Sequence, residues 1–314
     1  MLSESDPVSP RQRRLWARRR MRRMRRMRRR HRRRLPPISV IPTLCTLGNL
    51  IAGFAAIHYA AKSPDDRLLW GWTPLTFAGA LIFLGMFLDA IDGSLARLTR
   101  STSELGGQLD SLADVITFGV APAFMTLRLV GIHLANQGWI IGPEADNVFG
   151  KIIWSVGAVY VCCAALRLAR FNVEMGPGTV NDHSLFRGLP SPGAAGTVAS
   201  LVILHQHLLV VVFANRVPAG FVQGAALGIP FIMFLCAVGM VSSIPYIHFA
   251  NRYFRGPRSF PYVVRLVLIL FLVVWWFQET VALGFTIYAL SGPVRLLLAR
   301  YRRQHRPRAA TPVT

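Results

Sequence analysis

Residues 89–114 read DAIDGSLARLTRSTSELGGQLDSLAD and lie between two long apolar runs of the chain. Five of the fourteen acidic residues of the protein fall within this segment. A carboxylate at membrane depth costs a few kcal/mol unless it is paired, hydrated or bound to a metal. Aspartates at the ends of apolar helices therefore need a partner, and we expect this segment to carry the function.

The aspartates of this segment form two pairs. Asp89 and Asp92 are three residues apart and Asp110 and Asp114 are four apart, so each pair occupies one face of its helix. If the two faces meet, four like charges repel one another unless a cation lies between them. Oxygen ligands favour Mg²⁺, Mn²⁺ or Ca²⁺ over softer metals. The spacing therefore predicts a divalent metal site formed by all four aspartates.

Small and basic residues between the two pairs suit a phosphate-containing substrate. Gly93 permits close approach of the backbone, Ala96 leaves room for a planar base, and Gly106 opens the next helix. Arg97 is suited to phosphate oxygens, although an arginine just outside a span also serves as an interface anchor. These residues predict a groove for a nucleotide-activated substrate.

The composition places the chain in a bilayer. Of 314 residues, 53% are apolar and only 16% are charged. Apolar runs, each long enough to cross about 30 Å of hydrocarbon as a helix, lie near 38–60, 72–91, 111–134, 152–170, 192–213, 217–241, 261–278 and 280–298. We expect an all-α integral membrane protein with about eight transmembrane helices.

The formal charge of +22 is concentrated at the two ends of the chain. Sixteen arginines lie between Arg11 and Arg34, and a smaller basic cluster extends from Arg295 to Arg308. The positive-inside rule then places both termini, and by the crossing count the aspartates, in the cytoplasm. We expect a disordered tail at 1–34, a transmembrane catalytic domain at 35–300 and a basic tail at 301–314.

Three arginines lie at the predicted cytoplasmic ends of later spans. Arg167 and Arg170 are three residues apart and share a helix face, and Arg187 follows in the next loop. They are candidates to bind the acceptor and the transferred phosphate. The alternative is that they only anchor the spans at the interface.

The full motif resembles the signature of the CDP-alcohol phosphatidyltransferase family. It runs Asp89-x₂-Asp92-Gly93-x₂-Ala96-Arg97, then eight residues, Gly106, three residues, Asp110, three residues and Asp114. Eight defining positions over 26 residues make this a specific match. The stretches 117–122 (TFGVAP), 165–172 (ALRLARFN) and 186–192 (FRGLPSP) resemble bacterial members of the family that use serine.

This resemblance implies the fold of the family, a site and a reaction. The four aspartates would bind Mg²⁺ or Mn²⁺ and the CDP phosphates, Gly93, Ala96, Arg97 and Gly106 would shape the CDP pocket, and Asp114 would also act as general base. The substrates would be CDP-diacylglycerol and L-serine, in the bacterial cytoplasmic membrane. A homodimer among membrane lipids is expected from the resemblance alone.

Other interpretations remain open from the sequence. The acceptor could be glycerol phosphate, inositol phosphate or an amino alcohol instead of serine. The aspartates could instead form the intramembrane site of a cation transporter. The arginine-rich tail could bind anionic lipids or nucleic acid, but we expect a solvated tail and no nucleic-acid partner.

Overall fold

The computed structural model describes residues 40–66, 68, 71–99, 104–134, 140–174, 186–213, 216–246, 264, 267–268, 271–273 and 275–304. The predicted tail at 1–34 lies outside the described residues. The described elements are α2 (Val40–Ala61), α3 (Pro74–Thr99), α4 (Glu104–Asp114), the π-helical η2 (Val115–Val120), α5 (Ala121–Leu134), α6 (Val148–Glu174), β1 (Phe186–Arg187), α7 (Ser191–His205), the π-helical η4 (Gln206–Val212), α8 (Ala219–Val241), β2 (Pro245–Tyr246) and α11 (Phe277–Gln304).

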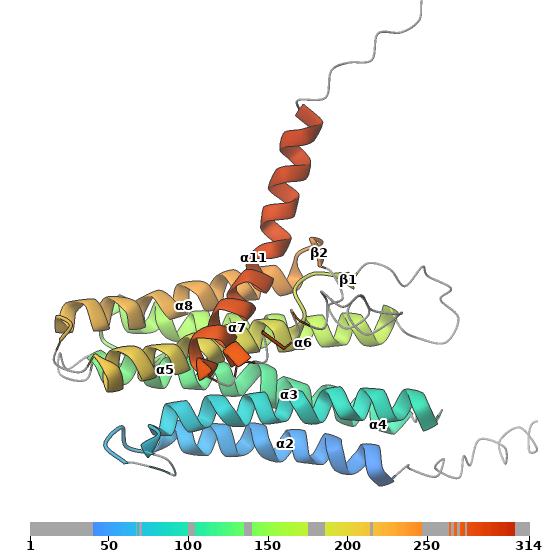
Figure 1. Ribbon diagram of the computed structural model, residues 1–314, viewed down its shortest axis with the longest axis horizontal. Coiled ribbons are helices and arrows are strands. Elements are labelled where there is room, and N and C mark those ends of the chain that lie inside the picture. Colours follow the sequence, from blue (N-terminus) through green and yellow to red (C-terminus); the bar gives the residue numbers. More distant parts are fainter. Residues whose placement is uncertain are drawn as a thin grey trace, which may run out of the picture. The chain divides into compact units, whose positions relative to one another are not determined.

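Long apolar helices make up nearly all of this structure (Figure 1). Within the part of the chain that the structure describes, seven segments are long and apolar enough to cross a membrane: Ile41–Ala61, Pro74–Leu95, Leu105–Leu134, Val148–Val173, Ser191–Val212, Ala219–Val241 and Phe277–Leu298. They correspond to seven of the eight predicted runs, and eight of the eighteen residues of the remaining run, 261–278, lie outside the described residues. The predicted all-α membrane fold is confirmed, with one two-residue strand pair added.

The two helices around residues 89–114 extend beyond the apolar runs 72–91 and 111–134. α3 continues to Thr99, and α4 begins at Glu104, close to the helix start expected at Gly106. Backbone hydrogen bonds continue through polar residues that contain no proline, so a helix can extend past its apolar run. The path from α4 through η2 into α5 is continuous, so Asp114 lies inside a long helical segment.

α7 is the central helix of the described bundle. Every residue from Gly193 to Ser200 is buried, and α7 contacts α3, α8 and α11 (Figure 1). Its small residues allow this crowding, because a methyl group added at Gly196 would collide with the ring of Phe285 on α11. Close approach at small residues is how helices gain packing energy in a membrane, where water provides no hydrophobic drive between them.

Several chain segments meet at one end of the bundle. α2 is antiparallel to α3, so that Thr46 near the start of α2 hydrogen-bonds to Asp92 near the end of α3. Asn172 at the end of α6 donates to the Ser111 hydroxyl of α4 over 2.8 Å. β1 pairs with β2 in antiparallel register, with Phe186 opposite Tyr246. These contacts bring the start of α2 and the last turn of α4 together with the ends of α3 and α6.

Two glycines allow α2 to lie very close to its neighbours. A methyl group added at Gly53 would lie 2.8 Å from the Thr117 Cα atom, and one at Gly85 of α3 would lie 2.7 Å from Asn49 Oδ1 of α2. By contrast, a methyl group added at Gly224 of α8 would meet nothing within 4 Å among the described residues. Of these three positions, only Gly53 and Gly85 therefore require glycine for packing.

We predict that Gly53→Ala destabilises the protein by about 1–3 kcal/mol, because the added carbon overlaps the Thr117 backbone, which cannot move as a flexible side chain would. The measurement is the melting temperature of the detergent-solubilised protein. Gly224→Ala is the matched control and should melt at or above the wild-type temperature. Equal melting temperatures for the wild type and both variants would contradict the close α2 contact.

Candidate active site

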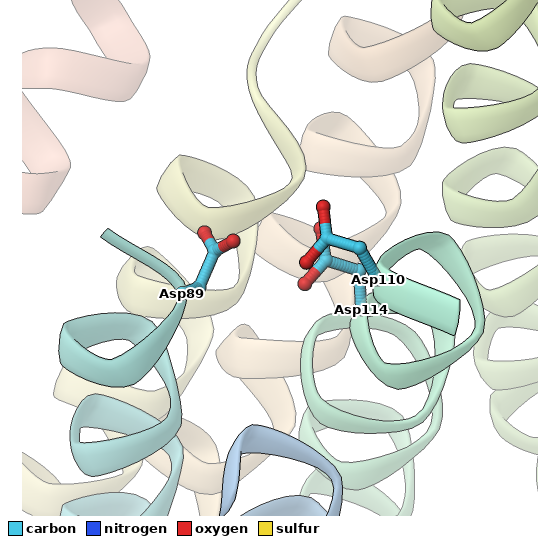
Figure 2. A group of neighbouring side chains, drawn as sticks. All are labelled: Asp89, Asp110 and Asp114. Atoms are coloured by element: carbon cyan, nitrogen blue, oxygen red, sulfur yellow. The ribbon is translucent and has the colours of Figure 1, made fainter. Parts of the chain in front are cut away.

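Three aspartate side chains converge between α3 and α4 (Figure 2). One carboxylate oxygen from each of Asp89, Asp110 and Asp114 lies within 4.8 Å of the other two. Asp89 comes from α3, and the other two project from the same face of α4 because they are one helical turn apart. Figure 2 shows the two α4 side chains turned toward Asp89. Asp89 of the first predicted pair thus lies close to both aspartates of the second pair.

These three carboxylates fit a hard divalent cation. Asp114 is only 7% exposed, and Asp110 Oδ1 is buried without a hydrogen-bond partner among the residues that the structure describes. A buried, unpaired oxygen is costly, and three neighbouring carboxylates repel one another. An all-oxygen donor set is the kind that Mg²⁺ and Mn²⁺ prefer. The described residues therefore offer a place for such an ion.

Asp92 is held differently from the other three aspartates. It is 7% exposed, and its Oδ2 accepts a hydrogen bond from the Thr46 hydroxyl of α2. It does not belong to the group of oxygens within 4.8 Å. The structure thus brings three of the four predicted ligands together and places the fourth beside them with a partner of its own.

Sequence reasoning missed the contribution of α2. Asn49 Nδ2 donates to Asp114 Oδ1 over 3.0 Å, in addition to the Thr46–Asp92 contact. Thr46 and Asn49 are polar residues three apart within the apolar run 38–60, and this was the available signal. Nothing in their local sequence shows which helix they face.

The small residues of the motif lie in the helices that carry the aspartates. Gly93 is exposed near the end of α3, and a methyl group added there would meet nothing within 4 Å among the described residues. Gly106 lies in the first turns of α4. Ala96 and Arg97 belong to α3, but the positions of their side chains lie outside the described part. Among the described residues, nothing therefore lies against Gly93 where a side chain would project.

The three predicted acceptor arginines belong to two elements, α6 and β1. Arg167 is half-buried, and its Nε donates to the carbonyl of Leu189, which follows β1. Arg170, one turn further along α6, is exposed. Arg187 lies in β1 opposite Pro245, and its side chain lies outside the described part. Arg167 therefore connects α6 to the loop that closes this end of the bundle.

That loop needs one special backbone conformation. Gly188 has a φ of 88°, and its N–H donates to the Ile244 carbonyl over 2.9 Å. A side chain at this position would collide with the carbonyl oxygen of Met240, at 2.5 Å from an added Cβ atom. Only glycine combines this φ with such close packing. The loop is thereby fixed against the end of α8.

Known proteins are similar to this chain over most of its helical region. The family described as CDP-alcohol phosphatidyltransferase matches residues 39–236, more than half of the chain. A CDP-diacylglycerol–serine O-phosphatidyltransferase of Helicobacter pylori (strain J99) is 34% identical over 168 residues, which cover 54% of this chain and 59% of the relative. The chain thus spans about three fifths of the length of that relative.

Two further relatives extend the comparison. A CDP-diacylglycerol–serine O-phosphatidyltransferase of Bacillus subtilis (strain 168) is 31% identical over 175 residues, which are 56% of this chain and 82% of the relative. An archaetidylserine synthase of Methanothermobacter thermautotrophicus is 31% identical over 208 residues, which are 66% of this chain and 69% of the relative. With the matched motif and the converging carboxylates, these likenesses show that the chain belongs to the CDP-alcohol phosphatidyltransferase family.

Proposed function

We propose that this protein is a CDP-diacylglycerol–serine O-phosphatidyltransferase, which transfers the phosphatidyl group of CDP-diacylglycerol to L-serine and releases CMP. The observation that carries the proposal is the convergence of Asp89, Asp110 and Asp114 within 4.8 Å, at the intervals typical of the family. A cation transporter would need carboxylates, but it would not need the glycine, alanine and arginine positions between them.

The choice of serine as acceptor is supported by the names of the relatives. The Helicobacter pylori and Bacillus subtilis proteins are both named for serine, and the archaeal relative is an archaetidylserine synthase. All three names include serine, although the archaeal name refers to a different lipid. Serine is therefore the acceptor we propose, ahead of glycerol phosphate, inositol phosphate or an amino alcohol.

The proposed cofactor is Mg²⁺ or Mn²⁺, held by Asp89, Asp110 and Asp114, with Asp92 beside them. When bound, such an ion neutralises charge on the pyrophosphate and on the departing CMP. The unpaired Asp110 Oδ1 and the all-oxygen donor set support this assignment.

Asp114 is the proposed general base. The serine Oγ attacks the phosphorus of the phosphatidyl group, the new P–O bond forms, and the P–O bond to CMP breaks. The serine hydroxyl proton passes to the Asp114 carboxylate as this happens. Asp114 Oδ1 accepts from Asn49 Nδ2, which fixes the orientation of the carboxylate and leaves its second oxygen for other partners.

The remaining residues of the motif complete the proposed substrate groove. Gly93, Ala96, Arg97 and Gly106 shape the CDP pocket, and the lack of described atoms within 4 Å of a carbon added at Gly93 supports this. Arg167, Arg170 and Arg187 supply positive charge for the phosphate and the serine carboxylate. Arg167 and Arg170 belong to α6, and Arg187 belongs to β1. The end of α6 contacts α4, because Asn172 donates to the Ser111 hydroxyl.

We also propose that the site and both termini face the cytoplasm, and that the protein forms a homodimer. The chain enters α2 at the end of the bundle that holds the carboxylates, as the Thr46–Asp92 contact requires. The sixteen arginines that precede α2 favour the cytoplasmic side for this end. The domain boundaries predicted after residues 34 and 300 remain predictions, and so does the homodimer.

We predict that the purified protein with CDP-diacylglycerol, L-serine and Mg²⁺ or Mn²⁺ forms phosphatidylserine and CMP in equal amounts. Asp110→Asn should lower kcat by more than about 100-fold, because it removes a proposed metal ligand, and changes in groups that only hydrogen-bond to such ligands already cost up to that much. Turnover is followed by CMP release and lipid chromatography, with each alternative acceptor assayed in parallel. CMP release only with another acceptor would change the substrate assignment, and metal flux in liposomes without CMP release would favour a transporter.

We predict that activity depends on a bound divalent ion. Exhaustive chelation should lower turnover to background, and Mn²⁺ or Mg²⁺ should restore it, because the three carboxylates repel one another when no cation lies between them. Zn²⁺ should restore it poorly, since the cluster offers only oxygen ligands. The readout is CMP release against added metal concentration. Full activity after complete chelation would contradict the proposed cofactor.

We predict that Arg167→Ala raises the KM for serine and lowers turnover, since it removes a positive charge near the proposed acceptor site. Because Arg167 also donates to the Leu189 carbonyl, the variant should melt at a lower temperature as well. Arg167→Lys keeps the charge but loses the planar guanidinium, so it should recover part of the serine affinity. Wild-type kinetics in a folded Arg167→Ala variant would remove this residue from the site.

A further inference from the structure

Two polar side chains of α2 each hold an aspartate on a different helix. The Thr46 hydroxyl donates to Asp92 Oδ2 of α3, and Asn49 Nδ2 donates to Asp114 Oδ1 of α4 over 3.0 Å. Thr46 and Asn49 are three residues apart, so they lie on one face of α2. This face of α2 therefore contacts both pairs of carboxylates at the site.

Both side chains are removed from water. Thr46 is 3% exposed and Asn49 is fully buried. A buried polar group without a partner costs about 1–3 kcal/mol, so the two bonds are a strong constraint on the folded state. The orientation of the Asn49 amide also follows, because a reversed amide would place its carbonyl oxygen against the Asp114 carboxylate. The amide therefore faces Asp114 with its donor side.

The face of α2 that carries these residues is itself fixed in place. The Thr117 hydroxyl of η2 donates to the Asn49 carbonyl over 2.9 Å. Close packing at Gly53 and Gly85 leaves no room for α2 to shift toward η2 or α3. Since η2 follows Asp114 directly, the helix that carries Asp114 is bonded to α2 at two successive places.

The Thr46 hydroxyl has two possible acceptors but only one proton. Its oxygen lies 3.1 Å from the Pro42 carbonyl, as well as beside Asp92 Oδ2. When the proton is given to Asp92, it restrains that carboxylate apart from the other three. When Asp92 turns toward a ligand, the same proton can be given to Pro42, so that the buried hydroxyl keeps a partner.

We propose that Thr46 and Asn49 are positioning residues for the carboxylate site: Thr46 sets the place of Asp92, and Asn49 sets the place of Asp114. They contact neither substrate nor metal and act through these two aspartates. This inference rests on the proposed function for its effect on turnover, and on the metal assignment for its effect on cation affinity. Outer partners of metal-binding carboxylates typically contribute about 10–100-fold in affinity or activity.

The test compares variants that differ only in hydrogen bonding. Thr46→Val keeps the shape of the side chain but removes the hydroxyl, whereas Thr46→Ser keeps the hydroxyl. Mn²⁺ affinity is measured on the purified full chain by electron paramagnetic resonance of free Mn²⁺, and kcat and KM are measured by CMP release. We expect Thr46→Val to lose about 10–100-fold in Mn²⁺ affinity or kcat, and Thr46→Ser to stay within about threefold of the wild type.

The second pair of variants addresses Asn49. Asn49→Leu removes the donor, and Asn49→Asp keeps the size but places another acceptor against Asp114 Oδ1. Both should lower kcat by about 10–100-fold, with a much smaller change in the KM for CDP-diacylglycerol. If Asn49 had only a structural role, the variants would be less stable, but they would not combine a large loss in kcat with a small change in KM. Asn49→Asp also gives a result if Asn49→Leu does not fold.

Thr126→Val is the matched control. Thr126 is fully buried and donates to the carbonyl of Pro122, four residues earlier, as Thr46 can to Pro42, but in the described structure it does not bond to a carboxylate. It should bind Mn²⁺ and turn over as the wild type does. If folded Thr46→Val and Asn49→Asp variants behave like Thr126→Val in both assays, the positioning role is overturned.

The two readouts separate this proposal from the proposed function. If the wild type releases no CMP with CDP-diacylglycerol and serine but binds Mn²⁺, the proposed reaction fails, and the Mn²⁺ affinities of the variants still test the role of α2. If the wild type releases CMP and the variants are as active and bind Mn²⁺ as tightly, the proposed reaction stands and the positioning role fails. A wild type that binds no Mn²⁺ or Mg²⁺ overturns the effect on cation affinity.

Discussion

Mutual repulsion among carboxylates within apolar helices is the constraint on which the rest of this structure depends. Asp89, Asp110 and Asp114 have oxygens within 4.8 Å of one another; Asp114 is buried and the other two are partly buried, so charge is costly there. Such an arrangement forms only if the surrounding helices hold it in place. The close packing of α2 against α3 and η2, and the hydrogen bonds from Asn49 and Thr46, provide that support.

The division of the four aspartates is chemically useful. Three converge, which suits an ion that bridges negatively charged groups, and the fourth is held by a hydroxyl that has another acceptor within reach. The π-helical stretch η2 begins directly after Asp114, and π-helical segments occur frequently at functional sites. It presents Thr117 to the Asn49 carbonyl, so the irregular backbone contributes directly to the placement of the site.

The end of the bundle near the site is closed by contacts that are distant in the sequence. Arg167 of α6 donates to the Leu189 carbonyl, and Gly188 is packed against the end of α8. The resemblance of residues 165–172 and 186–192 to serine-using relatives therefore falls on two segments that touch each other. Their contact gives these segments a shared structural role as well as the proposed role in binding the acceptor.

The sequence by itself determined the membrane helices, the family and the two aspartate pairs. These follow from local rules, because hydropathy over twenty residues and spacing of three or four along a helix depend only on neighbours in the chain. The tertiary structure alone decided that three aspartates converge while Asp92 bonds to Thr46, and that Asn49 faces Asp114. The first contact joins residues that are 46 positions apart in the sequence, and the second joins residues that are 65 apart. Both depend on how the helices pack, which no local pattern specifies.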